Sequence, residues 1–110
     1  MAYADHLVAR VLGILDRTGR YDDALIVLLS DHGEAFFEHG ACDHGHTVFE
    51  EEVAVPLVWR FPPRLARDKD VAVLVDRPLQ LVDLAPTLLA AVGGRFAGPT
   101  SGRDLLAPSD

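Results

Sequence analysis

A short apolar run that ends in an acid and an imidazole constrains this chain more than any other feature. Residues 25–33 read LIVLLSDHG. Large apolar residues in a row, bounded by polar ones, are typical of a central strand that is covered on both faces. In open α/β sheets, ligands bind at the carboxyl ends of the strands. The sequence therefore predicts an α/β fold with a polar site at the end of this strand.

Asp31 and His32, which follow the run, are both of types that bind metal ions. Carboxylate oxygen suits hard cations, and neutral imidazole nitrogen suits zinc and other transition metals. Gly33 lets the backbone turn sharply and approach an ion or a substrate closely. A motif of two residues often occurs by chance, and the alternative is a solvated turn at the end of a strand. Spacing alone leaves both interpretations open.

Size and composition limit the classes of function. The chain has 110 residues, one domain or less, and 49% of them are hydrophobic, so a packed core is expected. It carries 17 acidic and 10 basic side chains, a net charge of -7, and Lys69 is its only lysine. Binding to nucleic acid or to an anionic membrane is therefore disfavoured. The longest apolar run, residues 24–29, is far too short to span a bilayer, and the single Cys42 cannot form an intrachain disulfide.

Hydrophobic periodicity and capping residues predict the other elements. An amphipathic helix is expected over residues 3–18, with an apolar face made of Leu7, Val8, Val11, Leu12, Ile14 and Leu15. After the strand over 24–29 we expect a long loop over 31–47, a short helix over 48–52, and strands over 55–61 and 71–75. A further helix is expected to begin at the N-cap Asp83 and to end at Gly93 and Gly94. The tail over 97–110 is expected to be irregular. This number of helices and strands is close to the minimum for a sheet covered on both faces. Either the sheet is small, or the strands and helices that complete it are missing.

A second group of candidate ligands lies in the expected loop. Residues 39–46 read HGACDHGH, which places three imidazoles and one carboxylate within eight residues. They could complete a metal site or hold an anionic group, and a plain exposed loop is an equal alternative. The paired cysteines and helical histidine spacing of common zinc sites are absent. Glu50, Glu51 and Glu52 are interpreted as a solvated charge run. Glu34 has the same default interpretation, but it is near enough to Asp31 to support that metal ligand through a hydrogen bond.

Taken in order, these pieces resemble the sulfatase family, within the alkaline-phosphatase-like superfamily. The matching segments are residues 3–5, 15–16, 21–27, 30–34 (SDHGE), 38–40 (EHG), 44–51 (HGHTVFEE), 55–58 (VPLV), 81–89 (LVDLAPTLL) and 102–105 (GRDL). No single segment is decisive, but the ordered combination covers nearly the whole chain and is highly specific. The resemblance implies a partial alkaline-phosphatase-like α/β sheet with flanking helices.

The resemblance also implies roles for the candidate residues. In sulfatases, an Asp followed by Asn or His at this strand end binds a divalent cation, usually calcium, which corresponds to Asp31 and His32; manganese and zinc are the alternatives. A Lys or His ahead of the aromatic–Glu pair usually faces the ester, which corresponds to His44, with His46 as the alternative. Such an imidazole would stabilise negative charge on a small-molecule or saccharide sulfate ester. Asp83 matches a structural helix start and not a catalytic group.

Parts of the sulfatase machinery have no match in this sequence. Sulfatases take further acidic metal ligands from an N-terminal strand, and a nucleophile from a Cys/Ser-x-Pro-x-Arg motif whose first residue is oxidised to formylglycine. Cys42 does not fit that motif. Residues 1–110 are therefore expected to be one partial domain, the C-terminal portion of a sulfatase domain, that hydrolyses sulfate esters negligibly alone. The alternatives are a phosphate-ester hydrolase or phosphoglycerol-type transferase of the same superfamily, and a non-catalytic remnant or subunit that binds a cation weakly.

Overall fold

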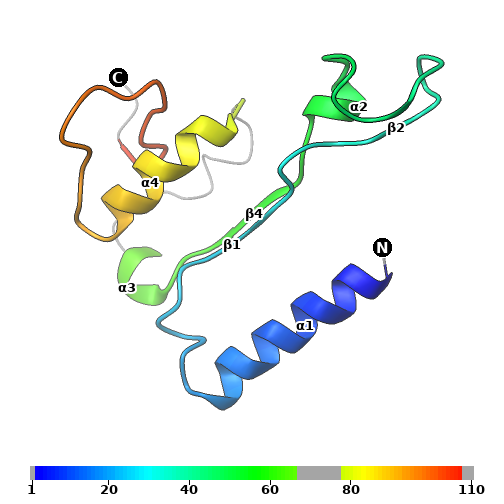
Figure 1. The fold of residues 1–110 in the computed structure, drawn as a ribbon. Coiled ribbons are helices and arrows are strands. Elements are labelled where there is room, and N and C mark those ends of the chain that lie inside the picture. The colour runs from blue at the N-terminus through cyan, green and yellow to red at the C-terminus, as the bar shows by residue number, and fades with distance from the viewer. Residues whose placement is uncertain (1, 67–77, 108–110) are drawn as a thin grey trace. The chain divides into compact units, whose positions relative to one another are not determined.

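The computed structural model describes residues 2–66 and 78–107, which belong to two compact units, Met1–Phe61 and Pro62–Asp110. The first unit contains α1 (Ala2–Arg17), β1 (Ile26–Leu29), β2 (Ala35–Phe36), β3 (Cys42–Asp43), α2 (Glu50–Val53) and β4 (Leu57–Arg60) (Figure 1). The second contains α3 (Pro63–Ala66), the 3-10 helix η2 (Leu81–Asp83) and α4 (Leu84–Ala91). The strand predicted over 71–75 lies outside the described residues.

Helix α1 confirms the predicted amphipathic helix. Asp5 lies in its first turn and Arg17 in its last, where each side chain complements the helix dipole. The helix ends at Arg17, and Gly19 follows it with a φ of 67°, which suits a residue without a Cβ. No residue of α1 is buried, and Val11 is 57% exposed. The predicted apolar face therefore exists, but the described residues cover it only in part: Val8, Leu12 and Leu15 are half-buried.

Strands β1 and β4 form an antiparallel pair, with Ile26 opposite Arg60 and Leu29 opposite Leu57 (Figure 1). Both were predicted, with slightly wider bounds. The prediction that β1 is a central strand covered on both faces is wrong for the described residues. There β1 pairs with β4 alone, and Leu28 is 44% exposed. A ladder of two strands provides no second neighbour and no second layer for these side chains.

The predicted loop over 31–47 contains a short hairpin. Strands β2 and β3 pair with Ala35 opposite Asp43. The chain reverses between them through Phe37, whose φ is 72°, and Gly40, whose φ is 79°. Ala35 is 3% exposed and is one of the few buried apolar residues. The hairpin returns the second half of the segment to the end of β1, and α2 then begins near the predicted helix.

Helix α4 begins and ends close to the predicted residues, but its start is built differently. Asp83 is the N-cap residue of α4 as predicted, but its carboxylate makes no capping hydrogen bond to that helix. Because the turn η2 precedes α4, Oδ2 of Asp83 accepts the backbone N–H of Gln80 at 3.1 Å, and Oδ1 accepts that of Arg103 at 3.0 Å. Gly93, with φ of 82°, ends the helix as predicted. Among the described residues, no helix has the length and apolar character that a bilayer crossing requires.

Candidate functional site

Asp31 and His32 follow β1 directly and project side chains that solvent reaches. Their side chains are 87% and 44% exposed. Oδ1 of Asp31 lies 3.7 Å from Nε2 of His32 and also accepts the His32 backbone N–H at 3.1 Å. The carboxylate and the imidazole therefore face one another and are open to a ligand.

A backbone contact fixes the orientation of the His32 ring. Its Nδ1 lies 2.8 Å from the carbonyl oxygen of Gly33. Because a carbonyl oxygen only accepts, Nδ1 carries the hydrogen, and Nε2 of the neutral ring keeps its lone pair. This hydrogen bond, with the nearby charges of Asp31, Glu34 and Asp43, raises the pKa of His32 above its ordinary value of 6.5. Histidines that bind metals commonly donate their other ring N–H in this way.

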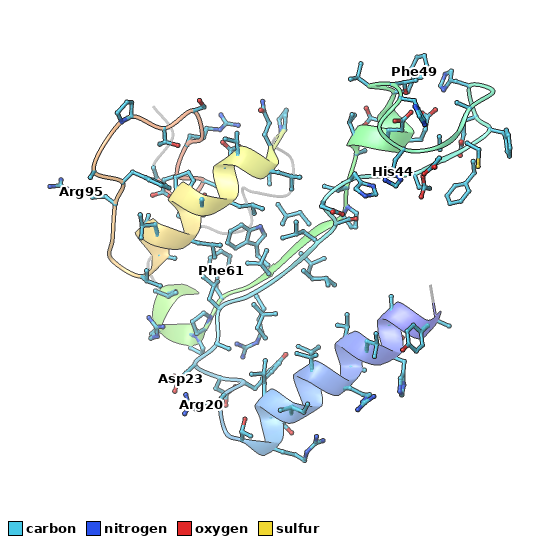
Figure 2. The ribbon with its side chains drawn as sticks, viewed as in Figure 1. Arg20, Asp23, His44, Phe49, Phe61 and Arg95 are labelled. Carbon is cyan, nitrogen blue, oxygen red and sulfur yellow. The ribbon has the colours of Figure 1, made fainter. Side chains whose placement is uncertain are left out.

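The β2–β3 hairpin places His44 against this turn. The rings of His32 and His44 stack with their centroids 3.9 Å apart and their planes 21° from parallel. Nδ1 of His44 lies 3.0 Å from Oδ1 of Asp43 and 3.3 Å from Oε1 of Glu34. Figure 2 shows His44 near the point where the β1–β4 ladder ends. Because both carboxylates only accept, they hold the Nδ1 hydrogen and leave Nε2 without a partner from this pair.

Glu34, Asp43 and His44 form a candidate cation-binding group, in which an ion would replace the Nδ1 hydrogen of His44 that the carboxylates otherwise hold. Each offers one ligand atom, and these atoms all lie within 4.8 Å of one another. Asp43 adopts a φ of 89°, a left-handed conformation that Asp tolerates better than most residues. Glu34 was predicted to support Asp31, but the structure brings its carboxylate to His44. Mixed carboxylate and imidazole donors suit divalent transition metals.

The predicted cluster over 39–46 is divided by the structure. Among the described residues, His46 is not part of the group that Glu34, Asp43 and His44 form, and its backbone N–H donates to Oε2 of Glu52 at 3.1 Å. Of the two histidines expected to face a substrate, His44 is therefore the one beside the Asp31 turn.

His39 turns to helix α2 instead. Its Nδ1 lies 2.5 Å from Oε1 of Glu51, and its ring stacks on Phe49 with centroids 3.9 Å apart. The hydrogen bond from His39 is the main cause that lowers the pKa of Glu51. His39 thus links the hairpin to α2, and Figure 2 shows Phe49 in that part of the chain.

Glu52 is the residue that the sequence interpretation missed. It is only 5% exposed, so the assignment of a solvated charge run is wrong at this position. Its carboxylate accepts the hydroxyl and the backbone N–H of Thr47 and the backbone N–H of His46. These hydrogen bonds, led by that from the Thr47 hydroxyl, lower the pKa of Glu52 from 4.5 to about 2. Nothing in the run of three glutamates distinguishes this one from its neighbours.

Acid should remove the stabilisation that the Glu52 carboxylate gives. Its pKa in the folded chain, about 2, lies below the ordinary value of 4.5, so the contribution is complete above that value and is lost as the pH falls toward 2. We expect the melting temperatures of the wild-type chain and of Glu52→Gln to differ most near neutral pH and to converge in acid. Circular dichroism melts across this pH range measure the difference. A difference that stays constant into acid would contradict the prediction.

A family model described as Sulfatase matches residues 1–94, and the chain belongs to the sulfatase family. Three curated relatives show the range of this similarity. The multifunctional alkaline phosphatase superfamily protein PehA of Trinickia caryophylli is 31% identical over 103 residues, which is 93% of this chain and 19% of that protein. The N-acetylglucosamine-6-O-sulfatase of Bacteroides thetaiotaomicron is 31% identical over 102 residues, 92% of this chain and 17% of that protein. Arylsulfatase K of Xenopus laevis is 30% identical over 105 residues, 96% of this chain and 18% of that protein.

A solved structure confirms the predicted fold class. The phosphonate monoester hydrolase SpPMH from Silicibacter pomeroyi matches with a TM-score of 0.78 and 35% sequence identity. The match covers 96% of this chain and 21% of that chain. The arrangement described above is therefore a part of the alkaline-phosphatase-like fold, and the chain spans less than a quarter of the length of the proteins it matches.

Proposed function

We propose that this chain forms part of the active site of a metal-dependent hydrolase of sulfate esters. Membership of the sulfatase family and two relatives named as sulfatases support this class of reaction. The observation that carries the proposal is the pairing of Asp31 and His32 at the end of β1, 3.7 Å apart and open to solvent. The chain supplies a portion of such a site, and turnover of the ester requires groups beyond Asp31, His32 and His44.

Asp31 and His32 are the proposed metal ligands. Metal–ligand distances of about 2.0 to 2.6 Å place neighbouring ligand atoms roughly 3 to 4 Å apart, which is the spacing of this carboxylate oxygen and this imidazole nitrogen. The hydrogen bond of His32 to Gly33 already presents Nε2 for ligation. Calcium needs further oxygen ligands, and the imidazole also suits manganese or zinc. A bound cation would polarise the ester and stabilise an attacking oxygen.

His44 is the proposed contact to the anionic part of the ester, with His46 as the alternative. Asp43 and Glu34 hold the Nδ1 side of the His44 ring, so Nε2 is the atom free to meet a substrate. In the imidazolium form, Nε2–H donates a hydrogen bond to a sulfate oxygen and stabilises charge that develops there. The stack against His32 keeps this group beside the proposed metal ligands.

A second candidate function is hydrolysis of a phosphate or phosphonate ester. The observation that favours it is the solved neighbour, which is itself a phosphonate monoester hydrolase. Sulfate and phosphate esters are both tetrahedral oxyanions, so the same imidazole and cation serve either. A nucleophile oxidised to formylglycine indicates the sulfate ester, and a threonine in its place indicates the phosphate ester or a phosphoglycerol-type transfer.

Cation binding to the 110-residue chain tests the proposal. Calorimetric titration with calcium, manganese and zinc is expected to show binding that Asp31→Ala and His32→Ala each weaken about tenfold or more, since even outer partners of a metal site contribute on this scale. Asp23→Ala, an exposed acid ahead of β1, is the matched control and leaves affinity unchanged. Binding that survives both substitutions would show that the site is wrong. Sulfate release from an aryl sulfate is expected to stay at the level of the metal alone.

A further inference from the structure

We infer that Glu52 is a positioning residue that joins the turn bearing Asp31 and His32 to the loop bearing His44 and His46. The inference deepens the proposed function and rests on it for the roles of the residues that are joined. The observations behind it are the hydrogen bonds of one buried glutamate. Its side chain bonds to the loop that bears His44 and His46, and its main chain bonds to the turn that bears Asp31 and His32.

The side chain of Glu52 fixes the loop. Oε2 accepts two successive backbone N–H groups, from His46 at 3.1 Å and from Thr47 at 3.2 Å, and Oε1 accepts the Thr47 hydroxyl. Two successive donors that converge on one oxygen restrict the backbone of the loop directly. A buried carboxylate is stable only when such donors satisfy it, so the loop and the carboxylate each depend on the other.

The main chain of Glu52 fixes the turn. Its carbonyl oxygen accepts the backbone N–H of Gly33 at 2.8 Å. A Cβ placed on Gly33 would lie 2.1 Å from the carbonyl oxygen of Glu51, so the turn and α2 are in direct backbone contact. Gly33 follows His32 immediately, and any shift of this contact therefore moves the proposed metal ligand.

These two attachments, together with the contacts of the His44 ring to Glu34 and Asp43, account for the alignment of the imidazoles. The β2–β3 ladder has only the pairs Ala35–Asp43 and Phe36–Cys42, and it ends before His44. Beyond that ladder, the loop carrying His44 is tied down through His46 and Thr47 to Glu52, which also holds the His32 turn. The stack of the two rings, with centroids 3.9 Å apart, is the geometry that this double attachment preserves. Among the described residues, the Glu52 carboxylate is held by N–H and O–H donors of His46 and Thr47 and by no ion pair.

Glu52→Gln tests the inference, because an amide keeps the size of the side chain but replaces one acceptor oxygen with a donor. Glu50→Gln is the matched control, since Glu50 is exposed and lies in the same helix. In NMR spectra of the wild-type chain we expect a nuclear Overhauser contact between the ring protons of His32 and His44. Glu52→Gln should lose this contact while circular dichroism still shows a folded chain, and it should weaken zinc binding about fivefold or more. Glu50→Gln should change neither property.

Two outcomes would overturn the role of Glu52: a ring contact that persists in Glu52→Gln, or its absence from the wild-type chain. If Glu52→Gln does not fold, Thr47→Val provides the same test. It removes the hydroxyl, which donates to Oε1 of Glu52 and accepts the Phe49 backbone N–H at 3.3 Å, and it leaves the carboxylate charged. It should therefore weaken the ring contact in a folded chain; an unchanged contact contradicts the inference. If the wild-type chain shows the ring contact but binds no cation, the proposed function is contradicted. The positioning role of Glu52 is not, because the ring contact still reports it.

Discussion

Replacing Gly33 with alanine is expected to lower the free energy of unfolding of the first unit by about 3 kcal/mol, at the upper end of the range for overpacked positions. The added Cβ would lie 2.1 Å from the carbonyl oxygen of Glu51 and 3.1 Å from the carbonyl carbon of Glu52. These are backbone atoms, which cannot rotate away as a side chain could. Relief of the overlap requires the turn and α2 to separate, and this breaks the 2.8 Å hydrogen bond from the Gly33 N–H to Glu52.

Urea unfolding followed by the fluorescence of Trp59 measures this effect, because the single tryptophan lies in β4 of the same unit. The control in the same unit is Gly13→Ala, since a Cβ there meets only the flexible end of the Arg17 side chain, at 3.3 Å, and alanine within a helix should not lower the free energy of unfolding. Zinc affinity should fall together with stability in Gly33→Ala, because the displaced turn carries the proposed ligands. An unchanged unfolding midpoint would mean that the close backbone contact is not formed.

Elements with local signals could be predicted from the sequence. The 3.6-residue period of α1, the apolar runs of β1 and β4, and the glycines after α4 each lie within a few residues of the structure that they specify. Which other segments pack against those elements could not be predicted. An apolar run such as that of Leu28 and Leu29 can have the same composition in a central strand and in a two-stranded ladder. Segments distant in sequence decide which of the two forms, so the run alone does not distinguish them.

The same distinction applies to the candidate site: contacts between sequence neighbours could be predicted, and contacts that the fold creates could not. The proximity of Asp31 and His32 follows from their adjacency at a strand end, and the choice of His44 came from the family resemblance. The stack of His44 on His32 depends on a hairpin whose turn includes Phe37 at a positive φ of 72°, which no propensity of phenylalanine indicates. Glu52 escaped notice because burial arises from the folded loop around it.

Thr87→Val is expected to destabilise the second unit by about 2 kcal/mol, because it leaves a buried donor without an acceptor. Thr87 is fully buried, and its hydroxyl donates to the carbonyl oxygen of Asp83 at 2.6 Å while it accepts the backbone N–H of Leu105 at 3.0 Å. Valine preserves the shape of threonine, so the expected effect comes from hydrogen bonding and not from a cavity. Leu105, 7% exposed, lies in a segment without helix or strand, so side-chain bonds such as this one hold it to α4.

Hydrogen exchange at the Leu105 amide reports this loss directly, because that N–H is the group left unpaired in Thr87→Val. We expect its protection to fall together with the stability of the unit in urea. Thr18→Val is the control, since the hydroxyl of Thr18 is exposed and bonds only to carbonyl oxygens at the end of α1. Its effect should stay within about 0.5 kcal/mol, as is usual for surface substitutions. If the Leu105 amide keeps its protection in Thr87→Val, another acceptor holds that N–H, and the attachment of residues 103–107 to α4 does not depend on the Thr87 hydroxyl.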